Sequence, residues 1–345
     1  MAGNLNAWVI HLAMAAVAAL VSAALIVALR PFLVRYALAR PNARSSHKQP
    51  TPQGGGIAVV AAMTIVTAGV LVLFPYLFAD PRQLSGALAA VLGLAIVGVT
   101  DDVRPLEALP RLILQTAAVA IVLAMLPAEL RVVPQLPWWL ERAGLLIGAI
   151  WFVNLVNFMD GIDWMTVAEV VPLTAALAVF GLTGTLPPGA TVVAFALCGA
   201  TLGFAPFNRP VARLFLGDVG SLPIGLALAW LLILLAGHGH LIAALLLPLY
   251  YMADATVTLL RRLAKAEPIM QAHRSHFYQR AIGNGFSVSQ VVARVFIVNV
   301  VLCALAAITL NTHGRGLHWV MLAVGVVLVA ALLLNFVGGR HAKAR

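Results

Sequence analysis

Eleven long apolar runs constrain the fold of this chain more than any other feature of its sequence. A helix needs roughly 20 apolar residues to cross a bilayer. Runs of about this length lie at 7–29, 54–78, 82–100, 111–127, 142–159, 165–184, 189–207, 219–237, 240–262, 288–309 and 316–337. The runs are continuous, whereas strands of a transmembrane barrel alternate apolar and polar residues. We therefore predict an all-α integral membrane protein with about eleven transmembrane helices, forming one polytopic membrane domain over 1–345.

The composition excludes the main soluble classes. Only 10% of the 345 residues are charged and 62% are hydrophobic, whereas charged residues make up about a quarter of a typical soluble domain. Cys198 and Cys303 lie inside apolar runs without metal-ligand spacing, so we expect both to be packing residues. The first run has no basic segment before it and no A-x-A cleavage site, so we expect a retained span rather than a signal peptide.

The basic residues predict which ends of the helices face the cytoplasm. With the N-terminus outside, one set of loops holds seventeen of the 22 Lys and Arg residues, and the opposite set holds four. Cytoplasmic loops carry the excess of Lys and Arg. This topology explains the net charge of +10 without a nucleic-acid partner, which would need a soluble basic face. We therefore predict that the loops at about 30–53, 101–111, 160–164, 208–218 and 261–287 face the cytoplasm.

The first of these loops carries Lys48 and the stretch Pro50-Thr51-Pro52-Gln53-Gly54-Gly55-Gly56. Free N–H groups at the start of a helix, next to a lysine, suit an anion such as phosphate. Taken alone, the loop is explained somewhat better as a basic, flexible segment, because glycine-rich loops are weak signals.

Two clusters of acids and amides follow the third and fifth runs. Asp101 and Asp102 are adjacent carboxylates that repel each other unless a cation offsets them. They could act as a general base, attract a metal or orient a basic ligand, and the alternative is a solvated helix end. Asn154, Asn157 and Asp160 share one face of a helix, and Asp163 follows. This oxygen-rich group suits Mg²⁺, although an ordinary helix C-terminus before Gly161 would also explain part of it.

Two further loops carry polar groups. Asp218 lies between glycines just before an apolar run, where it could bind a metal or cap the helix. Phe215 is either a packing residue or a platform for a base. The segment from His273 to Arg280 could hold a diphosphate, because Arg matches phosphate bidentately. A zinc site there would lack ligands. We assign no ligand to Asp254 and expect it to form an ion pair with Arg261 or Arg262.

The order of these motifs resembles that of a known enzyme family. Pro50 to Gly56, Asp101-Asp102, Asn154 to Asp163, Gly217 to Ser221 and His273 to Arg280 resemble the polyprenyl-phosphate N-acetylhexosamine-1-phosphate transferases, which include the peptidoglycan lipid-I translocase. The resemblance implies an enzyme of the bacterial cytoplasmic (inner) membrane that transfers a sugar-1-phosphate from a UDP-N-acetylhexosamine to undecaprenyl phosphate and releases UMP. A homodimer is compatible with it.

The resemblance also implies roles for the acids. Asp218 resembles the principal Mg²⁺ ligand, with Asn157 as a second ligand, and Mn²⁺ could substitute. Asp101 and Asp102 resemble paired acids that activate or position the lipid phosphate, and Asp160 is grouped with them as catalytic.

Substrate contacts are implied in the same way. Asp163 and Phe215 match positions that hold uracil by hydrogen bonding and stacking. The remaining substrate-binding residues, for the diphosphate, other phosphates and the oxygen-rich cluster, are His273, Arg274, His276, Lys48, Arg111 and Asn154.

Two departures from the family pattern bear on the substrate. Trp164 stands where the family usually has Gly, which affects the local turn and the fit of the sugar. The last motif lacks the three-His-plus-Glu pattern of the peptidoglycan enzyme, which favours priming of O-antigen or another cell-envelope polysaccharide. The alternatives are a phospho-MurNAc-pentapeptide transferase that forms lipid I and, more remotely, a secondary transporter.

Overall fold

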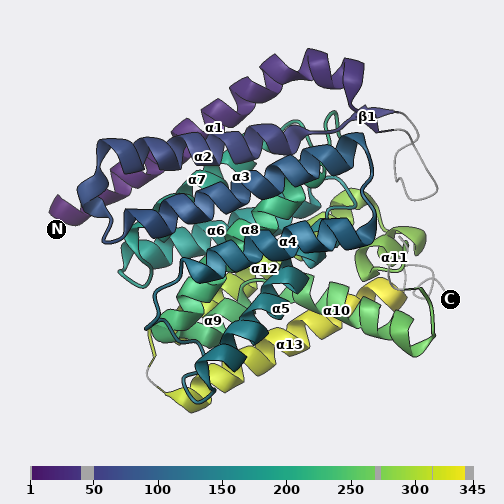
Figure 1. Ribbon diagram of the computed structural model, residues 1–345. Coiled ribbons are helices and arrows are strands. Elements are labelled where there is room, and N and C mark those ends of the chain that lie inside the picture. Colours follow the sequence, from purple (N-terminus) through teal and green to yellow (C-terminus); the bar gives the residue numbers. More distant parts are fainter. Residues whose placement is uncertain (1, 40–49, 269–272, 313, 339–345) are drawn as a thin grey trace.

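The computed structural model describes residues 2–39, 50–268, 273–312 and 314–338, and these are almost entirely helical (Figure 1). The helices are α1 Ala2–Tyr36, α2 Gly55–Leu73, α3 Pro81–Val103, α4 Ala108–Ala124, α5 Trp138–Met159, α6 Met165–Leu182, α7 Pro188–Phe204, α8 Asp218–Leu235, α9 Leu241–Leu246, α10 Leu249–Ala264, α11 Phe277–Gly283, α12 Val288–Leu310 and α13 Arg315–Gly338. Two short turns, η1 Pro75–Leu77 and η2 Ala236–His240, follow α2 and α8. A short antiparallel pair joins β1 Leu38–Ala39 to β2 Thr51–Pro52. The predicted phosphate contact Lys48 lies outside the described residues.

The all-helical membrane architecture is confirmed. Within the described residues, eight helical segments are long and apolar enough to cross a bilayer, and α4 and α7 are shorter apolar helices of 17 residues each. The count of about eleven spans and the outside position of the N-terminus stay predictions. We predicted one helix for the run at 240–262, and this is wrong: the run is divided into α9 and α10. Pro248 lies at the break, where it has no backbone N–H to continue a helix.

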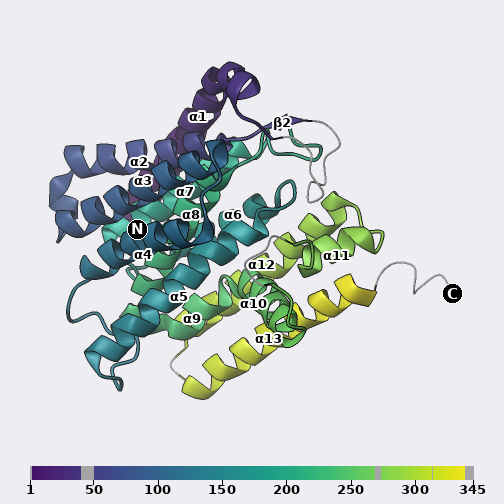
Figure 2. The same cartoon turned by 45° about the vertical axis from the view of Figure 1, so that its right-hand side comes forward.

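Helix α8 forms the centre of the bundle. Every residue from Val219 to Leu235 is buried, which is typical of a helix that is apolar on all sides. It packs against α2, α3 and α5, and the views in Figures 1 and 2 show these long helices lying side by side. The start of α8 is therefore held between its neighbours at one end of the bundle.

Glycines allow the helices to approach closely at that end. A Cβ atom on Gly98 would collide with the carbonyl group of Asp218, and one on Gly56 would collide with the backbone of Gly220. Only glycine leaves room for such backbone contacts. The glycine-rich start of α2 therefore packs against α8.

A polar contact joins α6 to α12. Pro172 in α6 has no N–H for the carbonyl oxygen of Ala168. The Asn299 side chain of α12 donates to this oxygen at 3.0 Å and to Glu169 Oε2 at 2.7 Å. The amide from the neighbouring helix thus satisfies a carbonyl group that the proline would otherwise leave without a donor.

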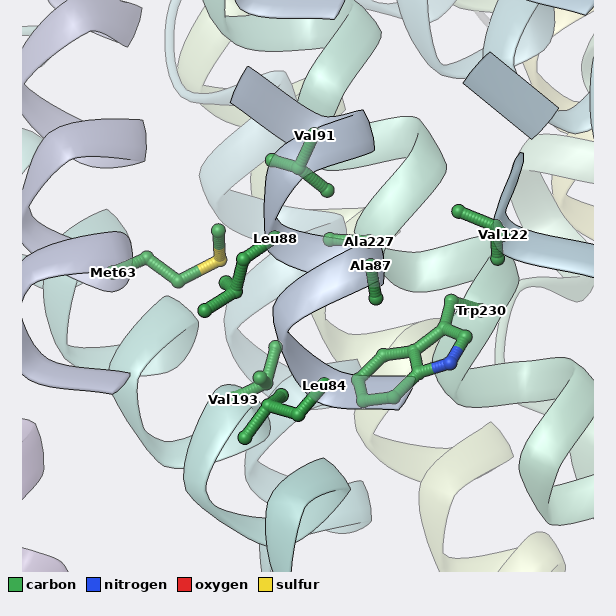
Figure 3. A pocket seen from close by; sticks show the side chains of 9 residues that line it. All are labelled: Met63, Leu84, Ala87, Leu88, Val91, Val122, Val193, Ala227 and Trp230. Atoms are coloured by element: carbon green, nitrogen blue, oxygen red, sulfur yellow. The ribbon is translucent and has the colours of Figure 1, made fainter. Parts of the chain in front are cut away.

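Figure 3 shows a small void in the core, surrounded by apolar side chains. It has a volume of about 10 Å³. The side chains around it come from α2, α3, α4, α7 and α8: Met63, Leu84, Ala87, Leu88, Val91, Val122, Val193, Ala227 and Trp230. A void of this size and apolar lining is a packing feature, not a ligand site.

Candidate active site

The predicted polar clusters meet at one end of the bundle, the right-hand end in Figure 1. There α3 and α5 end, α4 and α8 begin, and α11 follows the end of α10. The ends of these helices thus bring five separate segments of the sequence together.

Asp102 at the end of α3 caps the start of α8. Its Oδ1 accepts a hydrogen bond from the backbone N–H of Asp218 at 2.9 Å, and its Oδ2 accepts one from Val219 at 3.1 Å. The Gln53 side chain donates to the same Oδ1 at 3.2 Å. Gly217 precedes the helix with a φ of 78°, and a Cβ atom there would meet the Asp102 carboxylate. The carboxylate satisfies backbone donors that a helix start otherwise leaves without partners, and it thereby holds Asp218 in place.

The side chain of Asp218 faces a second carboxyl group and one guanidinium. Asp101 and Asp218 lie within hydrogen-bonding reach of each other. Arg111 Nη1 lies 3.0 Å from Asp101 Oδ2 and 3.9 Å from Asp218 Oδ2. The Asn157 side chain donates to Asp218 Oδ1 at 2.7 Å. Two adjacent carboxyl groups need a proton or a further cation between them, since Arg111 alone supplies only one positive charge.

This arrangement fits Mg²⁺ of the kind that completes its shell with water and substrate. The described part of the chain holds no group of three or more His, Cys, Asp and Glu side chains in metal-binding geometry. Mg²⁺ often uses one or two carboxylates together with waters and substrate phosphates. Asp218 and the neighbouring Asp101 would supply such carboxylate oxygens. The predicted second ligand Asn157 donates its amide to Asp218 in this structure, and its role as a ligand stays a prediction.

Asp160 is a half-buried acid outside the spans. Desolvation, together with the nearby charges of Asp102 and Asp163, raises its pKa to about 7. The Thr166 hydroxyl donates to Asp160 Oδ1, which lowers the pKa and only partly opposes these effects. A carboxyl group with such a pKa can take up or release a proton near neutral pH.

A cavity of about 590 Å³ opens beside these acids. The polar side chains that line it are Arg111, Gln115, Asn154, Asn157, His273, His276, Tyr278 and Gln279. The apolar ones include Leu112, Ile147, Ile150, Trp151 and Leu259. Asn154 donates to Gln115 Oε1 at 2.8 Å and so links α5 to α4. A cavity lined by both polar and apolar side chains suits an amphipathic ligand that carries a polar head.

Not every predicted contact lines this cavity. Asp163 is buried, and its Oδ2 accepts a hydrogen bond from the backbone N–H of Ala212 at 2.9 Å. The backbone N–H of Phe215 donates to Pro52 at 2.9 Å. Both residues therefore shape the 205–217 loop in this structure. Arg274 is exposed and does not line the cavity either.

The glycine-rich loop is also explained differently. The backbone N–H groups of Gly54 and Gly55 donate to the carbonyl oxygen of Phe215, and that of Gly56 donates to Leu216. The hypothesis that these N–H groups bind phosphate is therefore wrong, because they are already engaged.

Asp254 is not the partner of the nearby arginines. Arg262 pairs with Glu267 at 3.0 Å, whereas Asp254 Oδ1 faces His276 Nδ1 at 3.3 Å. Sequence reasoning missed the wall residues Gln115 and Tyr278. The signal for Gln115 was a polar side chain inside an apolar run, which is costly in a membrane unless it has a partner.

Trp164 adopts the backbone conformation that explains the family's glycine. Its φ is 62°, in the left-handed region that favours glycine. Its backbone N–H donates to Asn208 Oδ1 at 2.7 Å, and its indole N–H donates to the carbonyl oxygen of Ala205 at 2.6 Å. The ring is thus bonded to the end of α7 and is not part of the cavity wall.

Comparison with known proteins agrees with this geometry. Residues 84–236 match glycosyl transferase family 4. The chain is 24% identical to a probable undecaprenyl-phosphate N-acetylglucosaminyl 1-phosphate transferase of Bacillus subtilis, over 86% of this chain and 85% of that protein. It is 26% identical to a decaprenyl-phosphate N-acetylglucosaminephosphotransferase of Mycobacterium leprae, over 86% and 83%. It is also 34% identical to a phospho-N-acetylmuramoyl-pentapeptide-transferase of Moorella thermoacetica, over 56% and 65%.

The matched residues include α3, α5 and α8, which carry Asp101, Asp102, Asn157 and Asp218. The full-length relatives are named as phosphotransferases or sugar-phosphate transferases. This part of the chain therefore resembles glycosyl transferase family 4, and the protein is a multi-pass membrane phosphotransferase.

Proposed function

We propose that this enzyme transfers a sugar-1-phosphate from a UDP-N-acetylhexosamine to undecaprenyl phosphate and releases UMP. The observation that carries the proposal is the cavity lined by Arg111, Asn157 and His276 together with apolar side chains. A lipid phosphate needs both kinds of lining, because its head is charged and its chain is hydrocarbon. The names of the relatives from Bacillus subtilis and Mycobacterium leprae agree with a polyprenyl-phosphate acceptor.

In the proposed reaction, an oxygen of the lipid phosphate attacks the phosphorus that bears the sugar. The new bond is oxygen to phosphorus, and the bond from that phosphorus to the oxygen bridging to UMP breaks. UMP leaves with the bridging oxygen and its electron pair. In such reactions, positioning and charge stabilisation supply most of the catalysis.

Residues of this chain would supply that stabilisation. Arg111, 3.0 Å from Asp101, offers a guanidinium to phosphate oxygens. Asp218 would hold Mg²⁺, which when bound neutralises charge on the phosphates, and Mn²⁺ is expected to substitute. His273 and His276 also line the cavity and would contact the diphosphate.

The finer assignment concerns the donor and the polysaccharide. The segment from His273 to Arg280 lacks the pattern of the peptidoglycan enzyme, which favours a UDP-N-acetylhexosamine and priming of O-antigen or another envelope polysaccharide. The match to the Moorella thermoacetica protein keeps a MurNAc-pentapeptide donor as the alternative. The basic loops favour an active site on the cytoplasmic face of the inner membrane.

An exchange assay with a donor panel tests the proposal. Purified protein with Mg²⁺ and undecaprenyl phosphate is expected to release UMP from a UDP-N-acetylhexosamine and to lose this activity when the metal is chelated. Release only from UDP-MurNAc-pentapeptide would select the alternative. Absence of UMP release with every donor would overturn the proposed reaction.

Replacing Trp164 with glycine is expected to leave the ratio of rates among donors unchanged. The ring lies outside the cavity wall, so its loss should not alter contacts to the sugar. The change relieves left-handed strain of roughly 1 kcal/mol but removes the indole hydrogen bond, worth about 1 kcal/mol. The change also removes a ring that packs against the core, so thermal unfolding should occur at a lower temperature. Trp164→Phe, which keeps a ring but not the N–H, is the control, and an altered donor ratio in Trp164→Gly would place the ring at the sugar.

A further inference from the structure

We propose that Asp254 is the positioning residue of the active-site histidine: it holds His276 with hydrogen on Nδ1, so that Nε2 faces the cavity and its phosphate-bearing substrate. The inference deepens the proposed function, on which it rests. Asp254 lies on α10, behind the cavity wall, and does not itself line the cavity.

The Asp254 carboxylate is fully buried, with 0% exposure, and accepts several hydrogen bonds. Its Oδ1 accepts the backbone N–H of Phe277 at 3.0 Å, and its Oδ2 accepts that of Tyr278 at 3.1 Å. The Tyr250 hydroxyl donates to Oδ2 at 3.1 Å. Both oxygens therefore act as acceptors, and together they tie the start of α11 to α10.

The same carboxylate determines which nitrogen of His276 carries hydrogen. His276 Nδ1 lies 3.3 Å from Asp254 Oδ1. A carboxylate has no hydrogen to donate, and both Asp254 oxygens accept from other donors, so the imidazole is the donor in this contact. The ring is then held with Nδ1–H toward the carboxylate, and Nε2 is its remaining polar atom.

Stacking fixes the plane of the ring. His276 stacks on Tyr278 with centroids 5.7 Å apart and on His273 with centroids 4.9 Å apart. The Tyr278 hydroxyl donates to the carbonyl oxygen of Phe158 at 3.0 Å, which anchors this stack to the end of α5. His276 is 4% exposed and lines the cavity. The imidazole thus has a fixed position, a fixed plane and one nitrogen for a ligand.

This arrangement suits a phosphate oxygen, which is an anionic hydrogen-bond acceptor near neutral pH. Contact with such an oxygen requires a proton on Nε2, and that proton comes from solution. The resulting imidazolium is offset by the buried Asp254 carboxylate. In metal sites and hydrolases, a carboxylate behind a histidine likewise fixes its tautomer and orientation.

The tautomer can be measured without turnover. In ¹⁵N-histidine-labelled protein, the resonances of His276, identified by their loss in His276→Gln, are expected to show hydrogen on Nδ1 when no substrate is bound. A His276 ring that carries its hydrogen only on Nε2 would overturn the inference. This measurement stays decisive even if the proposed reaction fails in the donor assay.

Kinetics separate positioning from a purely structural role. Asp254→Asn is expected to raise KM for the UDP-sugar about 10- to 100-fold, as loss of a charge-assisted hydrogen bond would, with a smaller change in kcat. In the His276→Gln background, the same change should raise KM no further, because the residue acts through the histidine. Additive effects in the double variant would show a structural role only and overturn the proposal.

Thr258→Val is the matched control. Its hydroxyl donates to the same Asp254 Oδ1, at 3.5 Å, from the same helix but does not touch His276. This variant is expected to keep the wild-type KM and the Nδ1–H tautomer. If Asp254→Asn fails to fold, the tautomer in the wild-type protein still decides.

Discussion

Asp218→Ala is expected to lower turnover by about 10³-fold or more while the protein stays folded. The Asp218 carboxylate accepts a hydrogen bond from Asn157 and lies 3.9 Å from the Arg111 guanidinium, and it is the proposed Mg²⁺ ligand. Losing such charge stabilisation raises the activation free energy of the reaction by several kcal/mol. The cap on α8 uses the backbone N–H of residue 218, so it survives the change. UMP release against Mg²⁺ concentration, with circular dichroism for folding, measures the result.

The control for this variant is Asp80→Asn. Asp80 also lies at a helix start, where its side chain accepts the backbone N–H of Arg82 at 3.0 Å, but it belongs to the loop before α3 and not to the cavity. This variant should keep full activity. If Asp218→Ala retained activity with the same Mg²⁺ dependence, the assignment of the metal to Asp218 would be wrong.

Asp102→Ala is expected to lower kcat about 100-fold or more, and Asp102→Asn is expected to recover at least about tenfold of that loss. The structure shows Asp102 accepting hydrogen bonds from Asp218 and Val219. Asparagine keeps one acceptor oxygen for this cap, whereas alanine keeps none. The loss of a helix cap also lowers the free energy of unfolding by about 1–2 kcal/mol, which thermal unfolding would report.

Comparing these two variants distinguishes two roles for Asp102, capping of α8 and removal of a proton from the lipid phosphate. A residue that removes a proton from the lipid phosphate would be disabled equally by asparagine and alanine. Equal inactivity of Asp102→Asn and Asp102→Ala, in folded protein, would therefore assign Asp102 a proton-transfer role. Recovery in Asp102→Asn, with a raised Mg²⁺ requirement in Asp102→Ala, would support the positioning of Asp218.

Much of the helical architecture was predictable, because a bilayer demands long apolar helices. Helices α3, α6, α12 and α13 match predicted runs to within a few residues, whereas α2 ends at Leu73, before the end of the run predicted at 54–78. The division of the run at 240–262 was readable from Pro248 but was not predicted. Apolar length alone does not reveal such a break, since both halves remain hydrophobic.

The candidate site was predicted unevenly. Arg111, Asn154, Asn157, His273 and His276 do line one cavity. Asp163 instead supports a loop, through Ala212. A lone acid in a loop can face a ligand or a backbone N–H, and its sequence neighbours are the same in both cases. Asp254 was left without a role because its main partners lie more than 20 residues away, on α11.

The residues alone are enough to conclude that this chain folds as a helical membrane protein and that most of its aspartates lie at helix ends. Both conclusions follow from the high cost of polar groups in hydrocarbon, which acts on every residue separately. Which acid faces which partner depends on the fold, as in the cap between Asp102 and Asp218, 116 residues apart. Such pairing depends on how helices pack side by side, and close contacts such as that between Gly98 and Asp218 are a property of two helices together.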